Sequence, residues 1–198
     1  RYDSFHEEMR LNPASTLNDK LLTQLHAECT IKIQEARRRG FEYTLDEMLS
    51  LKIYSDTNEF QAALRKAHWT RTPLEIKRAF YQWAITMYRT FLFHAVPIPS
   101  IDGLSPIPLY HGLNRMFLVE NVSPHYHGPF STTKSIYTAN TYSGGKGLQF
   151  TLSSSYLNPL KVVVGIDMKS ISCHPNEHEL LLYDQVLPIA KTHAFQQG

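Results

Sequence analysis

Two carboxylates near the end of the chain, Glu177 and Glu179, are the residues whose type and spacing most directly suggest chemistry. They lead into the apolar run Leu180-Leu181-Leu182, which is typical of a strand. Side chains alternate along a strand, so we expect both carboxylates on one face, about 6–7 Å apart. Carboxylates in such a position can stabilise positive charge or take a proton from a nucleophile. The alternative is a solvated edge strand whose charges discourage aggregation.

Two earlier segments carry further polar groups that could share a site with these carboxylates. The segment 107–113 is a predicted short strand, and His111 and Gly112 lie near its end. The segment 128–133 is a second predicted strand, which ends in three consecutive hydroxyl side chains. Taken singly, these hydroxyl residues fit ordinary strand formers and His111 fits a structural histidine. Their order within one β-rich region is what makes them candidates for a site.

Two other polar segments are weaker candidates. His125 and His127 are expected in a loop rich in proline and glycine, and no third ligand is close in sequence, so we expect no metal site there. The run 144–147 contains three glycines and Lys146, but the spacing to a following Ser or Thr does not fit a phosphate-binding loop. We interpret that run as a turn before a strand.

Composition narrows the class of protein. The chain has 198 residues, 42% of them apolar, which is enough to bury a core without disulfides. The net charge of +2 gives no support for a nucleic-acid partner. No apolar run approaches the roughly 20 residues of a membrane span. The two cysteines, Cys29 and Cys173, lie far apart, which fits a reducing compartment and so a cytoplasmic or other intracellular location.

The first hundred residues are expected to be helical. Thr16 is a candidate cap for a first helix that should stop at Gly40. The stretch Thr44-Leu45-Asp46-Glu47 has the pattern of a capping box and should open a second helix. Further helices are expected over 58–68 and from Thr72 to before Pro97. The last of these should bury Phe80, Trp83, Ala84, Met87, Tyr88 and Phe91.

The stretch 96–108 contains four prolines and a glycine and cannot continue a helix. After it, short apolar runs alternate with turn residues, which predicts a β-rich region. The expected strands lie near 107–112, 128–132, 147–153, 160–167 and 178–187, with one short helix near 134–143. The predicted organisation is a helical lobe over 1–96, a proline-rich linker over 97–106 and a β-rich lobe over 107–198.

The ordered set of three motifs resembles the ADP-ribosyltransferase superfamily, most closely its arginine–serine–glutamate class. The hydroxyl run Ser131-Thr132-Thr133 matches the Ser-Thr-Ser motif of that class with one conservative change. Glu177-His178-Glu179 matches its Glu-x-Glu motif. Tyr142 lies eleven residues after Ser131, where such enzymes carry an aromatic that packs on the nicotinamide of NAD. The resemblance covers roughly residues 107–190.

The first motif departs from that class. The class has an arginine that holds the phosphates of NAD, and this chain has His111 there. Tyr110-His111-Gly112 instead resembles the poly-ADP-ribose polymerase branch, which lacks Glu-x-Glu. In that branch the histidine bonds a ribose hydroxyl of NAD and the glycine backbone holds the nicotinamide carboxamide. Arg115 and Lys146 are candidates to replace the missing cation.

The resemblance implies an α+β fold, with the N-terminal all-helical lobe packed on a split β-sandwich. It implies NAD as substrate, no metal, and a catalytic role for Glu179, which would stabilise positive charge on the ribose as nicotinamide leaves. Ser131 would hold Glu179, and Glu177 would orient or deprotonate the acceptor. His111, Gly112, Thr132 and Tyr142 would bind NAD.

The implied reaction is mono-ADP-ribosyl transfer to a protein acceptor, and a Glu at position 177 favours an arginine side chain. The loop 167–176 would recognise the acceptor, although it carries only His174 and no aromatic residue. Two alternatives stay open: an NAD glycohydrolase, and a non-catalytic binding module that keeps the fold. An RNA phosphotransferase of the same fold is disfavoured because a marked basic patch is missing.

Overall fold

The computed structural model describes residues 2–15, 17–57, 59–61, 63–64, 80–97, 109–113, 125–143, 148–152, 164–186 and 192–194. The chain forms two compact units. The first, here called the helical unit, comprises residues 1–94 together with 170–174. The second, the sheet unit, comprises residues 95–169 and 175–198. The chain therefore returns briefly to the helical unit, just before the two carboxylates.

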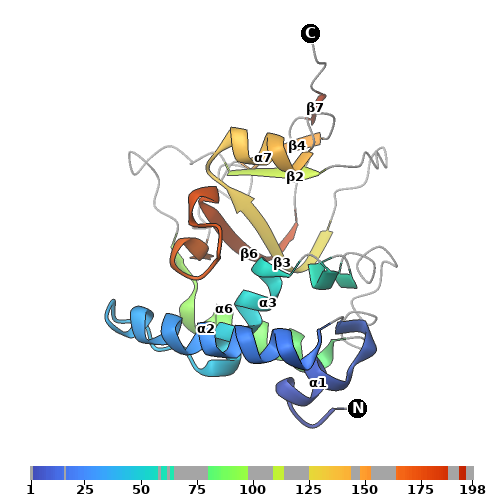
Figure 1. Cartoon of the computed structure of the whole chain (residues 1–198). Helices are drawn as coiled ribbons and strands as arrows, with labels where there is room; N and C mark the ends of the chain where they lie inside the picture. The colour runs from blue at the N-terminus through green and yellow to red at the C-terminus, as the bar shows by residue number, and fades with distance from the viewer. Residues whose placement is uncertain are drawn as a thin grey trace. The chain divides into compact units, whose positions relative to one another are not determined.

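Four α-helices with assigned bounds make up most of the described helical unit. Helix α3 packs against both α2 and α6, and α1 packs against α6 (Figure 1). Helical turns also occur at 59–61 and 63–64, within the predicted helix over 58–68, whose remaining residues 65–68 lie outside the described ones. The elements are α1 (Phe5–Leu11), the 3-10 turn η1 (Pro13–Ser15), α2 (Asp19–Arg37), α3 (Leu45–Asp56) and α6 (Tyr81–His94).

Local capping explains where these helices begin. The capping box at Thr44 is confirmed, because the Thr44 side chain and the Glu47 side chain each bond the other's backbone N–H. The predicted cap at Thr16 is wrong. Helix α2 starts at Asp19, and the side chain of Asn18 accepts a hydrogen bond from the backbone N–H of Leu21 at 2.9 Å. Asn18 caps because it directly precedes the first helical residue.

The end of α2 follows its pattern, whereas the packing of α6 follows its pattern only in part. Helix α2 ends at Arg37, and Gly40 takes a φ of +85° that suits glycine after a helix. Helix α6 buries Trp83, Met87 and Phe91 as expected, but the predicted burial of Ala84 and Tyr88 is wrong: Ala84 is half-buried and Tyr88 is 51% exposed. Helix α6 begins at Tyr81 after the non-helical Phe80, so the prediction of one continuous helix from Thr72 is wrong, and Thr72 itself lies outside the described residues. No helix in the described ranges combines the length and the apolar character of a membrane span.

In its described residues, the sheet unit combines an antiparallel sheet with the α-helix α7, so the predicted α+β class is confirmed. The hydrogen-bonded order of the strands is β1-β5-β6-β3-β2-β4-β7, and every neighbouring pair is antiparallel. Helix α7 lies against β2 and β4 (Figure 1). The split sandwich stays a prediction. The elements are β1 (Val96–Pro97), β2 (Leu109–Leu113), β3 (His125–Thr133), α7 (Ile136–Ser143), β4 (Leu148–Leu152), β5 (Val164–Asp167), η2 (Met168–Ser170), η3 (Pro175–Glu177), β6 (Glu179–Val186) and β7 (Thr192–Ala194).

The sheet extends beyond the five predicted strands. Pro97, which the sequence analysis assigned to the linker, pairs with Val164 in the short strand β1. A further short strand, β7, pairs with β4 at the opposite edge. Strands β1 and β7 lie at the two edges of the sheet and are only two and three residues long. Segments this short carry little alternation of apolar and polar residues, so the sequence pattern did not predict them. Among the described strands, the central pair β3 and β6 is the longest, and it carries Ser131, Thr132 and Glu179 of the predicted site.

Candidate functional site

Ser131 on β3 joins the hydroxyl motif to the carboxylate motif. Its hydroxyl donates a hydrogen bond to Oε1 of Glu179 at 2.6 Å. The register explains this contact, because Thr133 lies opposite Glu179 and Ser131 lies two residues along the same strand. Side chains two residues apart share a face, so Ser131 reaches Glu179 diagonally. Both residues are half-buried, and a carboxylate that accepts a hydroxyl bond there is held in one orientation.

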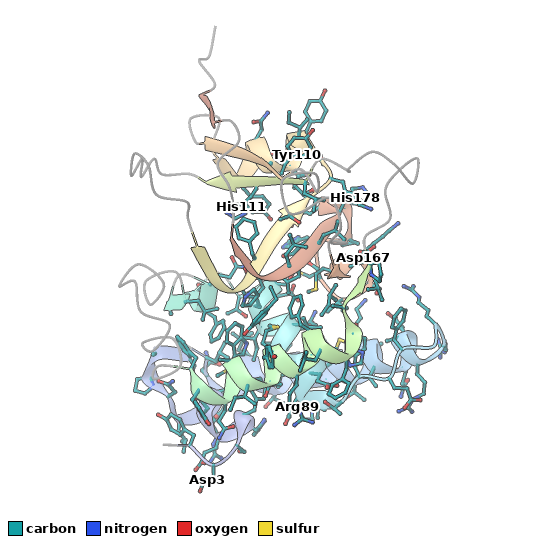
Figure 2. All side chains as sticks on the ribbon, turned by 180° about the vertical axis from the view of Figure 1, so that it is seen from behind. Asp3, Arg89, Tyr110, His111, Asp167 and His178 are labelled. Atoms are coloured by element: carbon teal, nitrogen blue, oxygen red, sulfur yellow. The ribbon has the colours of Figure 1, made fainter. Side chains whose placement is uncertain are left out.

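His111 on β2 contacts the same serine through the backbone. Its Nδ1 lies 2.7 Å from the carbonyl oxygen of Ser131. A carbonyl only accepts hydrogen bonds, so Nδ1 must carry the hydrogen, and in the neutral ring Nε2 is then the acceptor. The ring also packs on that of Phe130, with 4.3 Å between centroids, and Phe130 is fully buried. These two contacts set both the tautomer and the plane of the His111 ring (Figure 2).

Gly112 is required by the close approach of β2 to α7. A Cβ atom at this position would lie 2.1 Å from the backbone carbonyl oxygen of Ala139 and 3.0 Å from the Cβ of Tyr142. No side chain fits at such distances without moving the α7 backbone. Tyr142 itself is 53% exposed near the end of α7. The helix thus brings Tyr142 next to the His-Gly motif, while the contact of Tyr142 with nicotinamide stays a prediction.

The two threonines that follow Ser131 bond backbone atoms of the carboxylate segment. The Thr132 hydroxyl donates to the carbonyl of Leu180 at 2.8 Å, and Thr132 is buried. The Thr133 hydroxyl donates to the carbonyl of Glu177 at 2.7 Å. All three hydroxyls of the motif therefore reach across from β3 to the segment 177–180. A role for Thr132 in binding a cofactor stays a prediction.

Glu177 does not lie on the strand that the sequence predicts. It ends the short 3-10 helix η3, and β6 starts only at Glu179. His178 between them has a φ of +50°, the left-handed conformation, which costs about 1–2 kcal/mol for a residue with a Cβ. Simple alternation therefore does not set where the Glu177 side chain lies relative to Glu179. The expectation of two carboxylates on one strand face is wrong, because the chain turns at His178.

The loop 167–176, predicted to recognise an acceptor, contains a part that belongs to the helical unit. Residues 170–174 group with that unit, and the Cys173 backbone N–H donates to Oδ1 of Asp56 at 3.1 Å. Burial and the negative charge of Asp56 raise the pKa of the Cys173 thiol to about 11. Ile171 is buried, whereas His174 is exposed. The loop is thus anchored at 171–173 before it reaches the carboxylates.

Several predicted candidates fall outside what the structure describes. Arg115 and Lys146, proposed to replace the missing cation, lie outside the described residues, as do the side chains of His125 and His127. Within the described ranges, no group of three or more His, Cys, Asp or Glu residues is arranged to hold a metal ion.

The described site holds an oriented imidazole and an oriented carboxylate. His111 offers a ring nitrogen as acceptor for a hydroxyl, and Glu179 offers an oriented carboxylate that can stabilise positive charge. Both contact Ser131, so they belong to one cluster. Sequence reasoning gave Thr133 no role, although its place in the hydroxyl run was the signal that could have suggested one.

Comparisons with known proteins reveal the fold alone. No family model and no curated protein matches the sequence. Among solved structures, the chain is similar to Exoenzyme S from Pseudomonas aeruginosa, in complex with human 14-3-3 protein beta and bound to Carba-NAD. That match has a TM-score of 0.50 and 15% identity, and covers 82% of this chain and 76% of that one. A mutant of the eukaryotic mono-ADP-ribosyltransferase ART2.2 in complex with NAD gives a TM-score of 0.49 and 13% identity, with 90% and 84% covered. The chain therefore shares the fold of Exoenzyme S.

Proposed function

We propose that this protein is a mono-ADP-ribosyltransferase that moves ADP-ribose from NAD to an arginine side chain of a protein acceptor. The observation that carries the proposal is the double contact of Ser131, which bonds Glu179 through its hydroxyl and His111 through its carbonyl. Three motifs far apart in sequence thereby form one cluster. The fold shared with Exoenzyme S, which was solved with Carba-NAD bound, supports NAD as the substrate.

Glu179 is the proposed catalytic carboxylate. When the bond between ribose C1′ and the nicotinamide nitrogen breaks, its electron pair leaves with nicotinamide and positive charge develops on the ribose, as in glycoside cleavage. A carboxylate bonded to the ribose 2′-hydroxyl stabilises that charge. Ser131 keeps Glu179 in place, because a hydroxyl bond to a carboxylate is strong and directional.

The His-Gly motif is the proposed NAD-binding element, in the manner of the poly-ADP-ribose polymerase branch. The carbonyl of Ser131 sets the tautomer of His111, so that Nδ1 carries the hydrogen and the ring is held in one orientation for the proposed contact with a ribose hydroxyl. Gly112 contributes backbone groups for the nicotinamide carboxamide. Tyr142 on α7, whose Cβ lies close to Gly112 of β2, is the aromatic residue proposed to pack on the nicotinamide ring. Thr132 supports this element by bonding β6 to β3.

Glu177 is the proposed partner of the acceptor. A guanidinium stays protonated at neutral pH, so it must lose a proton before its nitrogen can attack C1′. The Glu177 carboxylate would orient the guanidinium and accept that proton. The loop 167–176 would hold the acceptor protein. The helical unit and the sheet unit correspond in this proposal to a helical lobe and an NAD-binding split β-sandwich.

Substitution of the two carboxylates tests the proposal. Glu179→Gln should lower nicotinamide release from NAD by about 100-fold or more, because the ribose loses its charge stabilisation. Glu177→Gln keeps Glu179 and should retain nicotinamide release while transfer to agmatine, an arginine analogue, falls. Undiminished nicotinamide release by Glu179→Gln would rule out the assigned mechanism.

The two alternatives predict other results. An NAD glycohydrolase would release nicotinamide and free ADP-ribose at the same rate with and without agmatine or an acceptor protein. A binding module would give heat on titration with NAD in a calorimeter but no nicotinamide. Absence of both heat and nicotinamide would remove all three functions.

A further inference from the structure

The contact between Thr133 and Glu177 is the feature of the site that the proposed function leaves unused. The Thr133 hydroxyl donates to the Glu177 carbonyl at 2.7 Å and accepts from the Ser135 backbone N–H at 3.0 Å. Thr133 is 6% exposed and is the last residue of β3, directly opposite Glu179. A buried hydroxyl that both donates and accepts has its position well determined.

This hydroxyl bonds the backbone at the point where the chain departs from the strand. Glu177 ends η3, His178 is left-handed with a φ of +50°, and β6 begins at Glu179. Among the described residues, His178 is the only one other than glycine with a positive φ. A strained residue persists only where its surroundings hold it. The bond from Thr133 fixes the peptide between Glu177 and His178, and therefore holds this turn.

We propose that Thr133 is a positioning residue that sets the place of the Glu177 carboxylate relative to Glu179, and so decides whether arginine or water receives ADP-ribose. The inference rests on the proposed function. Cleavage of the C1′–N bond needs Glu179, whose side chain is held separately by Ser131. Capture by arginine needs Glu177, whose backbone is held by Thr133. The two steps therefore depend on two different hydroxyls of β3.

The chemistry of the two outcomes differs only after nicotinamide has left with the bonding electron pair. In transfer, a guanidinium nitrogen forms the bond to C1′ and its proton goes to the Glu177 carboxylate. In hydrolysis, a water oxygen forms that bond and its proton goes to solvent. A displaced Glu177 should therefore favour hydrolysis without slowing the first cleavage.

The decisive measurement is the ratio of transfer to hydrolysis, with NAD and agmatine as substrates. Thr133→Val removes the hydroxyl and keeps the shape, and it should lower transfer about 10-fold, as expected for loss of one such bond, while nicotinamide release changes little. The Michaelis constant for agmatine should rise while that for NAD stays constant. Thr133→Ser keeps the hydroxyl and should restore the ratio.

Two further variants separate positioning from a loss of stability. Thr90 is also buried and donates its hydroxyl to a backbone carbonyl, that of Thr86 at 2.8 Å, but it lies on α6 in the helical unit. Thr90→Val should lower the melting temperature without changing the ratio. If Thr133→Val does not fold, His178→Val tests the same turn: valine resists a positive φ, so transfer should fall, whereas His178→Gly should preserve it.

If an active Thr133→Val or His178→Val protein keeps the wild-type ratio of transfer to hydrolysis, this inference is overturned and the proposed function stays intact. An equal fall of transfer and nicotinamide release in Thr133→Val also overturns it, because Thr133 would then support the whole site. A wild-type protein that releases no nicotinamide from NAD overturns the proposed function and this inference with it.

Discussion

Ser131 on β3 and Glu179 on β6 are 48 residues apart in the chain, yet they form a hydrogen bond between neighbouring strands. The distance from the Ser131 hydroxyl to Oε1 of Glu179 is 2.6 Å. Both residues are half-buried. A free carboxylate side chain rotates among several conformers, and this bond selects one of them. The catalytic role proposed for Glu179 therefore depends on Ser131.

Replacement of Ser131 tests that dependence. Ser131→Ala removes a hydrogen bond to a charged group, worth about 1.5–3 kcal/mol, so nicotinamide release should fall about 10- to 100-fold. The measurement is the rate of nicotinamide release at saturating NAD. Ser131→Thr retains a hydroxyl and should recover most of the activity. Equal rates for Ser131→Ala and wild type would show that Glu179 is oriented by other contacts.

Gly112→Ala should destabilise the sheet unit, because the added Cβ would lie 2.1 Å from the carbonyl oxygen of Ala139 and clash with it. Overpacking of this kind costs about 1–3 kcal/mol and sometimes more, and it should appear as a lower urea midpoint. Gly40 is the matched control, since it has open space but a φ of +85°. Asn tolerates a positive φ, so Gly40→Asn should cost little, while Gly112→Asn should be at least as harmful as Gly112→Ala.

Lys52→Met should destabilise the helical unit strongly. The Lys52 ammonium is 2% exposed and lies 2.6 Å from Oδ2 of Asp56 and 2.9 Å from Oε2 of Glu28. Its removal leaves the buried Asp56 charge uncompensated, which costs about 3–5 kcal/mol. Lys32→Met breaks the partly exposed pair with Glu35 and should cost less than about 1 kcal/mol. Similar urea midpoints for the two variants would contradict the prediction.

The cost of Lys52→Met should also depend on pH. Burial alone would lower the pKa of Lys52, but Asp56 and Glu28 raise it above its usual value, so its contribution is lost only as pH rises through that raised pKa. The hydrogen bond from Lys52 lowers the pKa of Glu28, so the contribution of Glu28 is lost as pH falls through that lowered pKa. Urea unfolding at several pH values should therefore show the largest difference near neutral pH.

Cys173 should react slowly with iodoacetamide despite its exposure. Burial of the sulfur, followed by the charge of Asp56, raises the pKa of this thiol to about 11, so little thiolate is present at pH 8. Allowing for the greater nucleophilicity of a more basic thiolate, the rate should be about 10-fold below that of an ordinary cysteine. Mass spectrometry of the alkylated protein gives the rate at each cysteine.

Cys29 provides the comparison within the chain. It is fully buried, and burial raises the pKa of its thiol to about 12, so it should react more slowly still. In urea both cysteines should react at one common rate. Rapid alkylation of Cys173 in the folded protein would mean that residues 171–173 are not anchored at Asp56.

Local sequence rules predicted the features that depend on neighbouring residues. The capping box at Thr44 and the turn at Gly40 follow from side chains and backbone within four residues, and both are present. The same rules would have found α1, because Ser4 accepts from the Glu7 backbone N–H at its start. The prediction of Thr16 as the cap was wrong because Asn18, two residues later, also has a side chain that can cap a helix. The local pattern does not show which of them directly precedes the first helical residue.

The sequence by itself determined which chemical groups the site has and their order along the chain: the His-Gly pair, the hydroxyl run and the two carboxylates. Only the tertiary structure decided how they meet. The register of β3 against β6 brings Ser131 to Glu179, and the turn at His178 removes Glu177 from the strand. Cross-strand register and a single left-handed residue depend on contacts between segments more than 40 residues apart, and a local pattern does not contain that information.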